Sequence, residues 1–200
     1  MISGEVRRWE ILNGLAPESV CQGAGVNYNQ EEGAYVLTSF GWRFVFYTKK
    51  CSIVSIEPEG EVLLSRYGDF FRLSSLWYLT NAQNIPFTNE LLHPQDLREG
   101  QLFYRGSHVL PLHKLANVYG NNKEGFLKKG QMLGGSILTY GDCSIGISPF
   151  PRIYMALILW LQDDEFPARA DLLFDKSCER QLPVDIAWST AMMSILMMFP

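Results

Sequence analysis

Three consecutive acidic residues, Asp163, Asp164 and Glu165, are the side chains in this sequence that best fit catalytic or metal-binding chemistry. Adjacent carboxylates repel one another, so one of them takes a raised pKa or the group recruits a cation. Asp163, Glu165 and the later Asp171 would supply hard oxygen ligands for a divalent cation, although their spacing matches no EF-hand loop. The alternative is a charged turn between two apolar strand segments, which needs no chemistry.

Two of the histidines could complete an acid–base site with these carboxylates. His93 precedes Pro94 and stands three residues before Asp96, so a turn can bring an imidazole and a carboxylate together. His108 is the second candidate, if the fold brings it near the acidic residues. Zinc binding by His108 and His113 is not expected, because their spacing does not place both imidazoles on one helix face.

The cysteines are too widely spaced to predict a metal centre. None stands at the C-x-x-C spacing that lets one turn present two thiolates to a metal, so reduced thiols are expected at Cys21, Cys51, Cys143 and Cys178. Cys178 lies in a polar stretch between Lys176 and Arg180, and we expect it to be the most accessible of the four. A nearby cation would lower its pKa.

Composition and missing motifs disfavour several functional classes. The formal net charge of -4 and the scattered basic residues disfavour nucleic-acid binding. The longest apolar run, IYMALILWL, is shorter than the roughly 18 residues of a membrane span. The N-terminal segment lacks the features of a signal peptide, so a cytoplasmic protein is expected. No phosphate-binding glycine loop and no Gly-x-Ser-x-Gly elbow is present, which favours a non-catalytic role.

The first half of the chain predicts helices followed by a β-hairpin. Val6, Trp9 and Leu12 recur at helical spacing, and Pro17 opens a second short helix. The apolar period then changes to two, and the segments AYVLTSF and WRFVFYT flank Gly41 as in a tight hairpin. A further strand, SIVSIE, and a helix, RLSSLWYLTNA, follow in the sequence.

The second half predicts a long irregular segment and then a run of strands. Residues 84–111 have the weakest periodicity and are expected to form a long surface excursion, a kind of segment that often carries function. After helices near 112–119 and 123–133, the segments SILTYGD, SIGISPFP, IYMALILWLQ and ADLLFDKS predict an antiparallel meander. Together these patterns predict one α+β domain over residues 1–200. Its mainly antiparallel sheet, made of the N-terminal hairpin and the C-terminal meander, is packed by terminal and central helices.

The closing segment, LPVDIAWSTAMMSILMMFP, predicts a helix that is apolar on nearly all sides. Such a helix is either buried against the sheet or covered by a partner, because an exposed methionine-rich face would need a cover. For the second alternative, a homodimer or another partner would contact Trp188, Met192, Ile195 and Met198.

The segment LWLQDDEFPARADLLFDKS and the following LPVDIAW carry a recognisable signature of a tryptophan, an acidic run, Glu-Phe-Pro, Leu-Phe-Asp-x-Ser and Leu-Pro-x-Asp. Its positions here are Trp160, Asp163, Asp164, Glu165, Phe166, Pro167, Leu173, Phe174, Asp175, Ser177, Leu182, Pro183 and Asp185. With the order of elements upstream, the signature resembles the uncharacterised prokaryotic family catalogued as domain of unknown function 3786, over nearly the whole chain. Gln162 departs from it, since a glycine is usual there.

The resemblance implies a context rather than an activity. Members occur in bacteria and archaea, mostly anaerobes, and some carry an additional iron–sulfur domain like that of corrinoid iron–sulfur proteins in one-carbon metabolism. This chain has no four-cysteine cluster, so no cofactor of its own is expected. The resemblance therefore implies an accessory or ligand-binding domain with an iron–sulfur or corrinoid protein as partner. The alternative is an acid–base or metal-assisted enzyme that uses the three acidic residues with a histidine.

Overall fold

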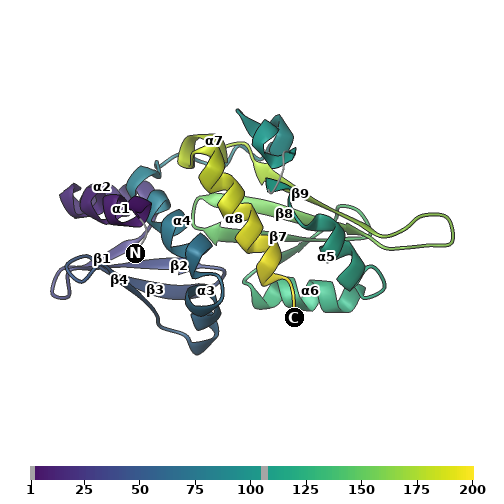
Figure 1. The fold of residues 1–200 in the computed structure, drawn as a ribbon, viewed down its shortest axis with the longest axis horizontal. Helices are drawn as coiled ribbons and strands as arrows, with labels where there is room; N and C mark the ends of the chain where they lie inside the picture. Colours follow the sequence, from purple (N-terminus) through teal and green to yellow (C-terminus); the bar gives the residue numbers. More distant parts are fainter. Residues whose placement is uncertain (1–2, 105–107) are drawn as a thin grey trace.

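Two antiparallel sheets organise the chain (Figure 1). The structure is a computed structural model and describes residues 3–104 and 108–200. The first sheet has the strand order β1-β2-β3-β4, with β1 (Asn27–Asn29), β2 (Ala34–Ser39), β3 (Trp42–Tyr47) and β4 (Ser52–Ser55). The second has the order β5-β9-β8-β7-β6, with β5 (Leu91–Leu92), β6 (Ser136–Leu138), β7 (Cys143–Phe150), β8 (Ile153–Trp160) and β9 (Arg169–Asp175). The α+β class is confirmed, but the hairpin and the meander lie in separate sheets.

Helices precede, join and follow the two sheets. In chain order they are α1 (Ser3–Gly14), α2 (Pro17–Ala24), α3 (Glu61–Ser65), α4 (Gly68–Asn81), α5 (Leu112–Tyr119), α6 (Lys123–Met132), α7 (Cys178–Gln181) and α8 (Val184–Met197). Short 3-10 helices lie at η1 (Pro58–Gly60), η2 (Pro94–Asp96) and η3 (Gly100–Tyr104). Helix α4 contacts both α1 and α8, and α8 runs in front of the second sheet in Figure 1. Among the described residues, no helix has the length and apolar character needed to cross a bilayer.

The predicted hairpin is confirmed as strands β2 and β3. Ser39 faces Trp42 across a two-residue turn in which Phe40 has a φ of 50° and Gly41 a φ of 80°. Positive φ at both central residues is the turn geometry whose twist matches that of the flanking strands. The glycine therefore sets the register that places Phe44 and Phe46 in the core.

The two faces of the second sheet are distinguished by the side chains of β8 that each one carries. We call inner the face of the fully buried β8 residues Ile153, Met155, Leu157 and Leu159. We call outer the face of Tyr154, Ala156, Ile158 and Trp160. Helix α6 lies against the inner face, because a side chain at Gly130 would collide with Ile145, the partner of Leu157. Strand β8 is the central strand and is apolar on both faces, as the sequence predicts.

The segment 84–111 is only partly irregular, which corrects the prediction of a simple surface excursion. Strand β5 adds to the edge of the second sheet, where Leu91 pairs with Asp175. Leu97, Phe103 and Leu110 are buried in the core. Residues 105–107 of this segment lie outside the described residues. The segment is therefore anchored to the sheet, and its long-range strand pairing leaves no local pattern in the sequence.

Tyr78 of α4 joins the N-terminal helices to the second sheet. Its ring stacks on Phe150 with centroids 4.9 Å apart, and both rings are fully buried. Its hydroxyl donates to the carbonyl of Ala24 at 2.6 Å and accepts from the backbone amide of Arg152 at 3.0 Å. One side chain thus links α2, α4 and the turn between β7 and β8.

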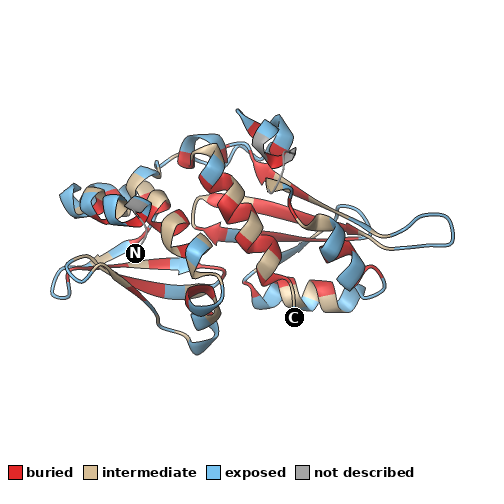
Figure 2. Ribbon diagram, in the orientation of Figure 1, coloured by how far each residue is buried: buried red, intermediate tan, exposed pale blue. Residues whose placement is uncertain are grey.

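The C-terminal helix is packed within the chain, so two of the predicted interface residues are not on a surface. Ile195 and Met198 are fully buried, whereas Trp188 and Met192 are half-buried. The polar side of α8 also has an internal partner, since Ser189 and Ser74 of α4 form a buried hydrogen bond of 3.0 Å. Figure 2 shows α8 largely in the colours of buried and intermediate residues. Its apolar character is explained by the core of one chain.

Candidate functional site

The three acidic residues lie in the turn that joins β8 to β9, at the end of a hairpin that projects from the body in Figure 1. All three are exposed. The carboxylate of Asp163 accepts backbone hydrogen bonds from Phe166 at 2.7 Å and Glu165 at 2.9 Å. These two amides lower the pKa of Asp163 below its ordinary value. Asp163 therefore holds the turn.

Replacing Asp164 by Asn together with Glu165 by Gln is expected to leave the melting temperature within about 2 °C of the wild type. Both side chains are exposed, and solvent screens their charges. Asp163→Ala is the matched comparison and should lower the melting temperature by more, because two turn amides lose their acceptor. Differential scanning calorimetry measures both. A large loss in the double variant would show that these acids have a structural role.

A cavity of about 640 Å³ lies beside this turn, with Asp163 and Phe166 in its lining, but its charged side chains already have partners within the chain. The guanidinium of Arg169 lies 3.9 Å from the ring centroid of Trp160. The carboxylate of Asp142 accepts from the backbone amide of Leu161 at 2.8 Å. Among the described residues, no histidine lines this cavity. The predicted combination of the acidic residues with His93 or His108 is therefore not formed here.

His93 contacts Asp171 rather than the predicted Asp96. Nδ1 of His93 lies 3.4 Å from Oδ1 of Asp171, and both side chains are partly exposed on the outer side of β9. The strand pairing of β5 with β9 brings the two residues together, and no short-range pattern predicts it. Asp171 does not join Asp163 and Glu165, because residues 3–104 and 108–200 contain no group of three or more His, Cys, Asp or Glu that could hold a metal ion.

His108 contacts the C-terminal helix instead of the acidic residues. Its ring packs edge-on against Trp188 with centroids 4.8 Å apart, and its carbonyl accepts a hydrogen bond of 2.6 Å from the indole Nε1. The contact explains why Trp188, predicted as an interface residue, is half-buried within one chain. His108 therefore positions the segment that precedes α5.

Cys178 is buried, which corrects the prediction that it is the most accessible cysteine. It is 1% exposed, and burial raises the pKa of its thiol, as do the charges of Glu179 and Asp175. The two neighbouring cations point elsewhere: Lys176 pairs with Glu90 at 3.0 Å, and Arg180 donates to Gln83 at 3.2 Å. Neither is therefore available to activate the thiol.

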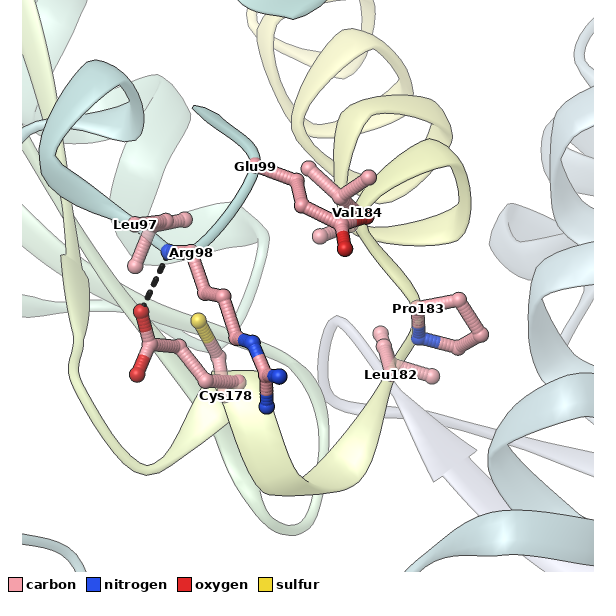
Figure 3. A pocket seen from close by; sticks show the side chains of 9 residues that line it. Leu97, Arg98, Glu99, Cys178, Leu182, Pro183 and Val184 are labelled. Carbon is pink, nitrogen blue, oxygen red and sulfur yellow. Dashed lines mark hydrogen bonds between the residues drawn. The ribbon is translucent and has the colours of Figure 1, made fainter. Parts of the chain in front are cut away.

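The space beside Cys178 is a small pocket near the start of α8 (Figure 3). The side chains of Cys178 and Arg98 point toward the same space, and the backbone amide of Arg98 donates to Glu179 at 2.5 Å. Its volume of about 160 Å³ is small. Ligand pockets usually measure about 300–1,000 Å³, so this pocket is not the best candidate.

Asp175, at the end of β9, is a buried carboxylate held by hydrogen bonds from Thr88, Asn89 and Ser177. It is 2% exposed. One oxygen accepts from the amide and hydroxyl of Thr88 at 3.1 and 3.0 Å and from the amide of Ser177 at 2.9 Å. The other accepts from the amide of Asn89 at 2.7 Å. Desolvation raises the pKa of Asp175, but the bonds from Ser177 and Thr88 outweigh it and leave the pKa below its ordinary value.

Beside Asp175, a cavity of about 330 Å³ opens on the outer face of the second sheet. We call it the aromatic cavity; its lining residues are Phe87, Asn89, Leu91, Leu138, Tyr140, Tyr154 and Asp175. The rings of Phe87 and Tyr154 lie 6.0 Å apart between centroids. Tyr154 can lie across the sheet because Gly146 has no side chain there, where a Cβ would collide with the phenol oxygen. The cavity has the size of a small-ligand site.

The sequence does not predict the aromatic cavity, because its wall comes from four separate segments. Asp175 belongs to the signature Leu-Phe-Asp-x-Ser, and its place after an apolar strand is the one local sign of a special role. Phe87 and Tyr140 stand in irregular segments, where isolated aromatic residues carry no periodic signal. The pairing of β5, β9, β8, β7 and β6 brings these residues to one face.

The fold and this cavity define a mixed α+β domain with a ligand-sized space on one face of its second sheet. The chain belongs to the family described as Domain of unknown function (DUF3786), which matches residues 16–197. The match confirms the predicted resemblance, including its extent over nearly the whole chain. No curated protein and no solved structure matches this chain.

Proposed function

We propose that this chain is a non-catalytic ligand-binding domain whose ligand occupies the aromatic cavity. The observation that carries the proposal is that Phe87 and Tyr140 are 40% and 47% exposed at the rim of a cavity instead of being packed in the core. Concave, mostly apolar spaces with few polar groups are the usual form of small-molecule sites. The larger cavity beside the acidic turn is a weaker candidate, because the carboxylates of Asp142 and Asp163 accept backbone amides and the guanidinium of Arg169 stacks on Trp160.

We further propose that the domain acts as an accessory to an iron–sulfur or corrinoid protein in an anaerobe. This part of the proposal is supported by the family resemblance alone. The chain would contribute binding, and its partner would contribute the cofactor. A cytoplasmic location and a homodimer stay predictions from the sequence.

A cavity-filling substitution tests the proposed site. In Leu138→Trp, a half-buried lining residue of β6 is replaced by a side chain large enough to fill the aromatic cavity. Saturation-transfer NMR against a mixed library of neutral, anionic and cationic small molecules should give compounds that bind the wild type and not this variant. Ile137→Trp is the matched control, because Ile137 is the adjacent residue on the same strand, is exposed and does not line the cavity.

Equal binding of every compound to the Leu138→Trp variant would contradict the proposed site. The ultraviolet–visible spectrum of the tagged wild-type chain, isolated without oxygen from an anaerobic host, tests the partner separately. Co-eluting absorption of a corrinoid or an iron–sulfur cluster is expected, and a colourless preparation would contradict that part of the proposal.

A further inference from the structure

The aromatic cavity has a negative charge in its wall that no cation of the described chain neutralises. Asp175 forms no ion pair with a lysine, arginine or histidine of residues 3–104 and 108–200. The adjacent Lys176 is directed to Glu90. The hydrogen bonds to the carboxylate from Thr88, Asn89 and Ser177 come from uncharged donors, so they hold it in the ionised form without cancelling its net charge.

The rings of the same cavity are also without a cation. Elsewhere in the molecule, arginines stack on aromatic faces: Arg169 lies 3.9 Å from the centroid of Trp160, and Arg8 lies 3.1 Å from that of Trp77. Within the described residues, no such contact involves Phe87, Tyr140 or Tyr154. Aromatic faces attract cations through their quadrupole, and several rings around one site are typical of sites for organic ammonium groups.

We propose that the aromatic cavity binds a small organic cation of the alkylammonium class. The ammonium group would lie among the rings of Phe87, Tyr140 and Tyr154, and Asp175 would supply the opposing charge from the wall. The inference rests on the proposed ligand-binding function and adds the chemical class of the ligand. Leu91 and Leu138 would contact its alkyl groups.

Other ligand classes fit these groups less well. A metal ion would need several oxygen, nitrogen or sulfur ligands, and the described residues form no such group around Asp175. An anion would be repelled by the carboxylate of Asp175. This carboxylate is buried, so water screens the repulsion only weakly. A neutral apolar molecule would also pack against the rings and leucines, but it would not neutralise the charge of Asp175. An experiment must therefore distinguish binding of a cation from binding of a neutral apolar molecule.

A charged and a neutral molecule of the same shape separate these alternatives. Choline and 3,3-dimethyl-1-butanol differ mainly in that a quaternary nitrogen replaces a carbon atom. We expect choline to shift the backbone amide signals of Asn89 and Leu138 in a saturable NMR titration at constant ionic strength. Its affinity should exceed that of the neutral alcohol roughly tenfold or more, since the rings and the carboxylate both act on the charge.

Two variants of rim residues locate the binding in this cavity. Phe87→Leu and Tyr140→Leu remove one ring each and leave an apolar side chain of moderate size, and both positions are partly exposed, so the fold should tolerate them. Each should weaken choline binding roughly threefold or more and leave binding of the alcohol nearly unchanged. Phe166→Leu is the control, because Phe166 is 65% exposed and lies outside the cavity.

The possible outcomes are distinct. Equal affinity for choline and the alcohol would overturn the proposed cation and leave the ligand-binding function standing. Absence of any saturable shift at Asn89 and Leu138 would also overturn the cation, and the library screen with the Leu138→Trp variant would then decide on the function alone. Preference for choline that is lost in the rim variants and kept in Phe166→Leu would support the inference.

Discussion

Asp175→Asn is expected to lower the free energy of unfolding by about 2–4 kcal/mol, because a buried acceptor of several hydrogen bonds is replaced by a group that also donates. Both carboxylate oxygens accept backbone amides, one from Asn89 and one from Thr88 and Ser177. Either orientation of an asparagine amide would therefore point its NH₂ group at a backbone N–H. Urea unfolding followed by circular dichroism measures the loss.

The pH dependence of stability gives a second test of the same residue. The pKa of Asp175 is below its ordinary value of 3.8 in the folded chain, so its contribution is present above that value and is lost as the pH falls through the folded pKa. The wild type should therefore lose more stability than the Asp175→Asn variant when the pH is lowered from neutral into that acid range. Asp171→Asn, on the same strand but partly exposed, is the control and should change stability little. If the Asp175→Asn variant unfolded with the same free energy as the wild type, the segment 88–89 would not be held by this carboxylate.

Tyr78→Phe is expected to cost about 2–4 kcal/mol, although it removes a single oxygen atom. The phenylalanine keeps the stacking on Phe150, but the carbonyl of Ala24 and the amide of Arg152 lose a buried partner. Equilibrium urea unfolding, monitored by tryptophan fluorescence and by far-ultraviolet circular dichroism, should show one common transition shifted to lower urea.

A half-exposed tyrosine provides the matched control for this substitution. Tyr67 also donates its hydroxyl to a backbone carbonyl, that of Leu196, at 3.1 Å. Tyr67→Phe should cost less, since water can replace the lost partner of a group near the surface. Equal effects at the two positions, or separate transitions for the two probes, would contradict the view that Tyr78 joins the N-terminal helices to the second sheet.

Local patterns predict most of the secondary structure of this chain. The turn at Gly41, the doubly apolar strand β8 and the paired helices α5 and α6 each have their cause within a few residues. The division into two sheets does not, because it depends on which strands meet after folding. The short strand β5 is missed for the same reason, since two residues carry no period and their pairing partner, β9, is more than eighty residues away.

Contacts between side chains that are far apart in the sequence could not be predicted from local patterns. His93 finds Asp171 instead of Asp96 because β5 runs beside β9. Cys178 is buried because α7 turns it inward while Lys176 and Arg180 meet other residues. The acidic residues 163–165 suggest chemistry by their types, but all three are exposed, and the carboxylate of Asp163 accepts hydrogen bonds from two backbone amides of the turn.

The projecting β8–β9 hairpin also has a practical consequence for work on this domain. The two strands are fully paired from Met155 with Phe174 to Trp160 with Arg169 before the chain enters the turn. Residues inserted after Asp164 would separate Asp163 from the amides of Glu165 and Phe166, but they would extend an exposed tip without altering the register of either strand. A fluorescent reporter or an affinity tag could be placed inside the chain at this point. The face that carries the aromatic cavity would then stay free for assays of ligand and partner binding.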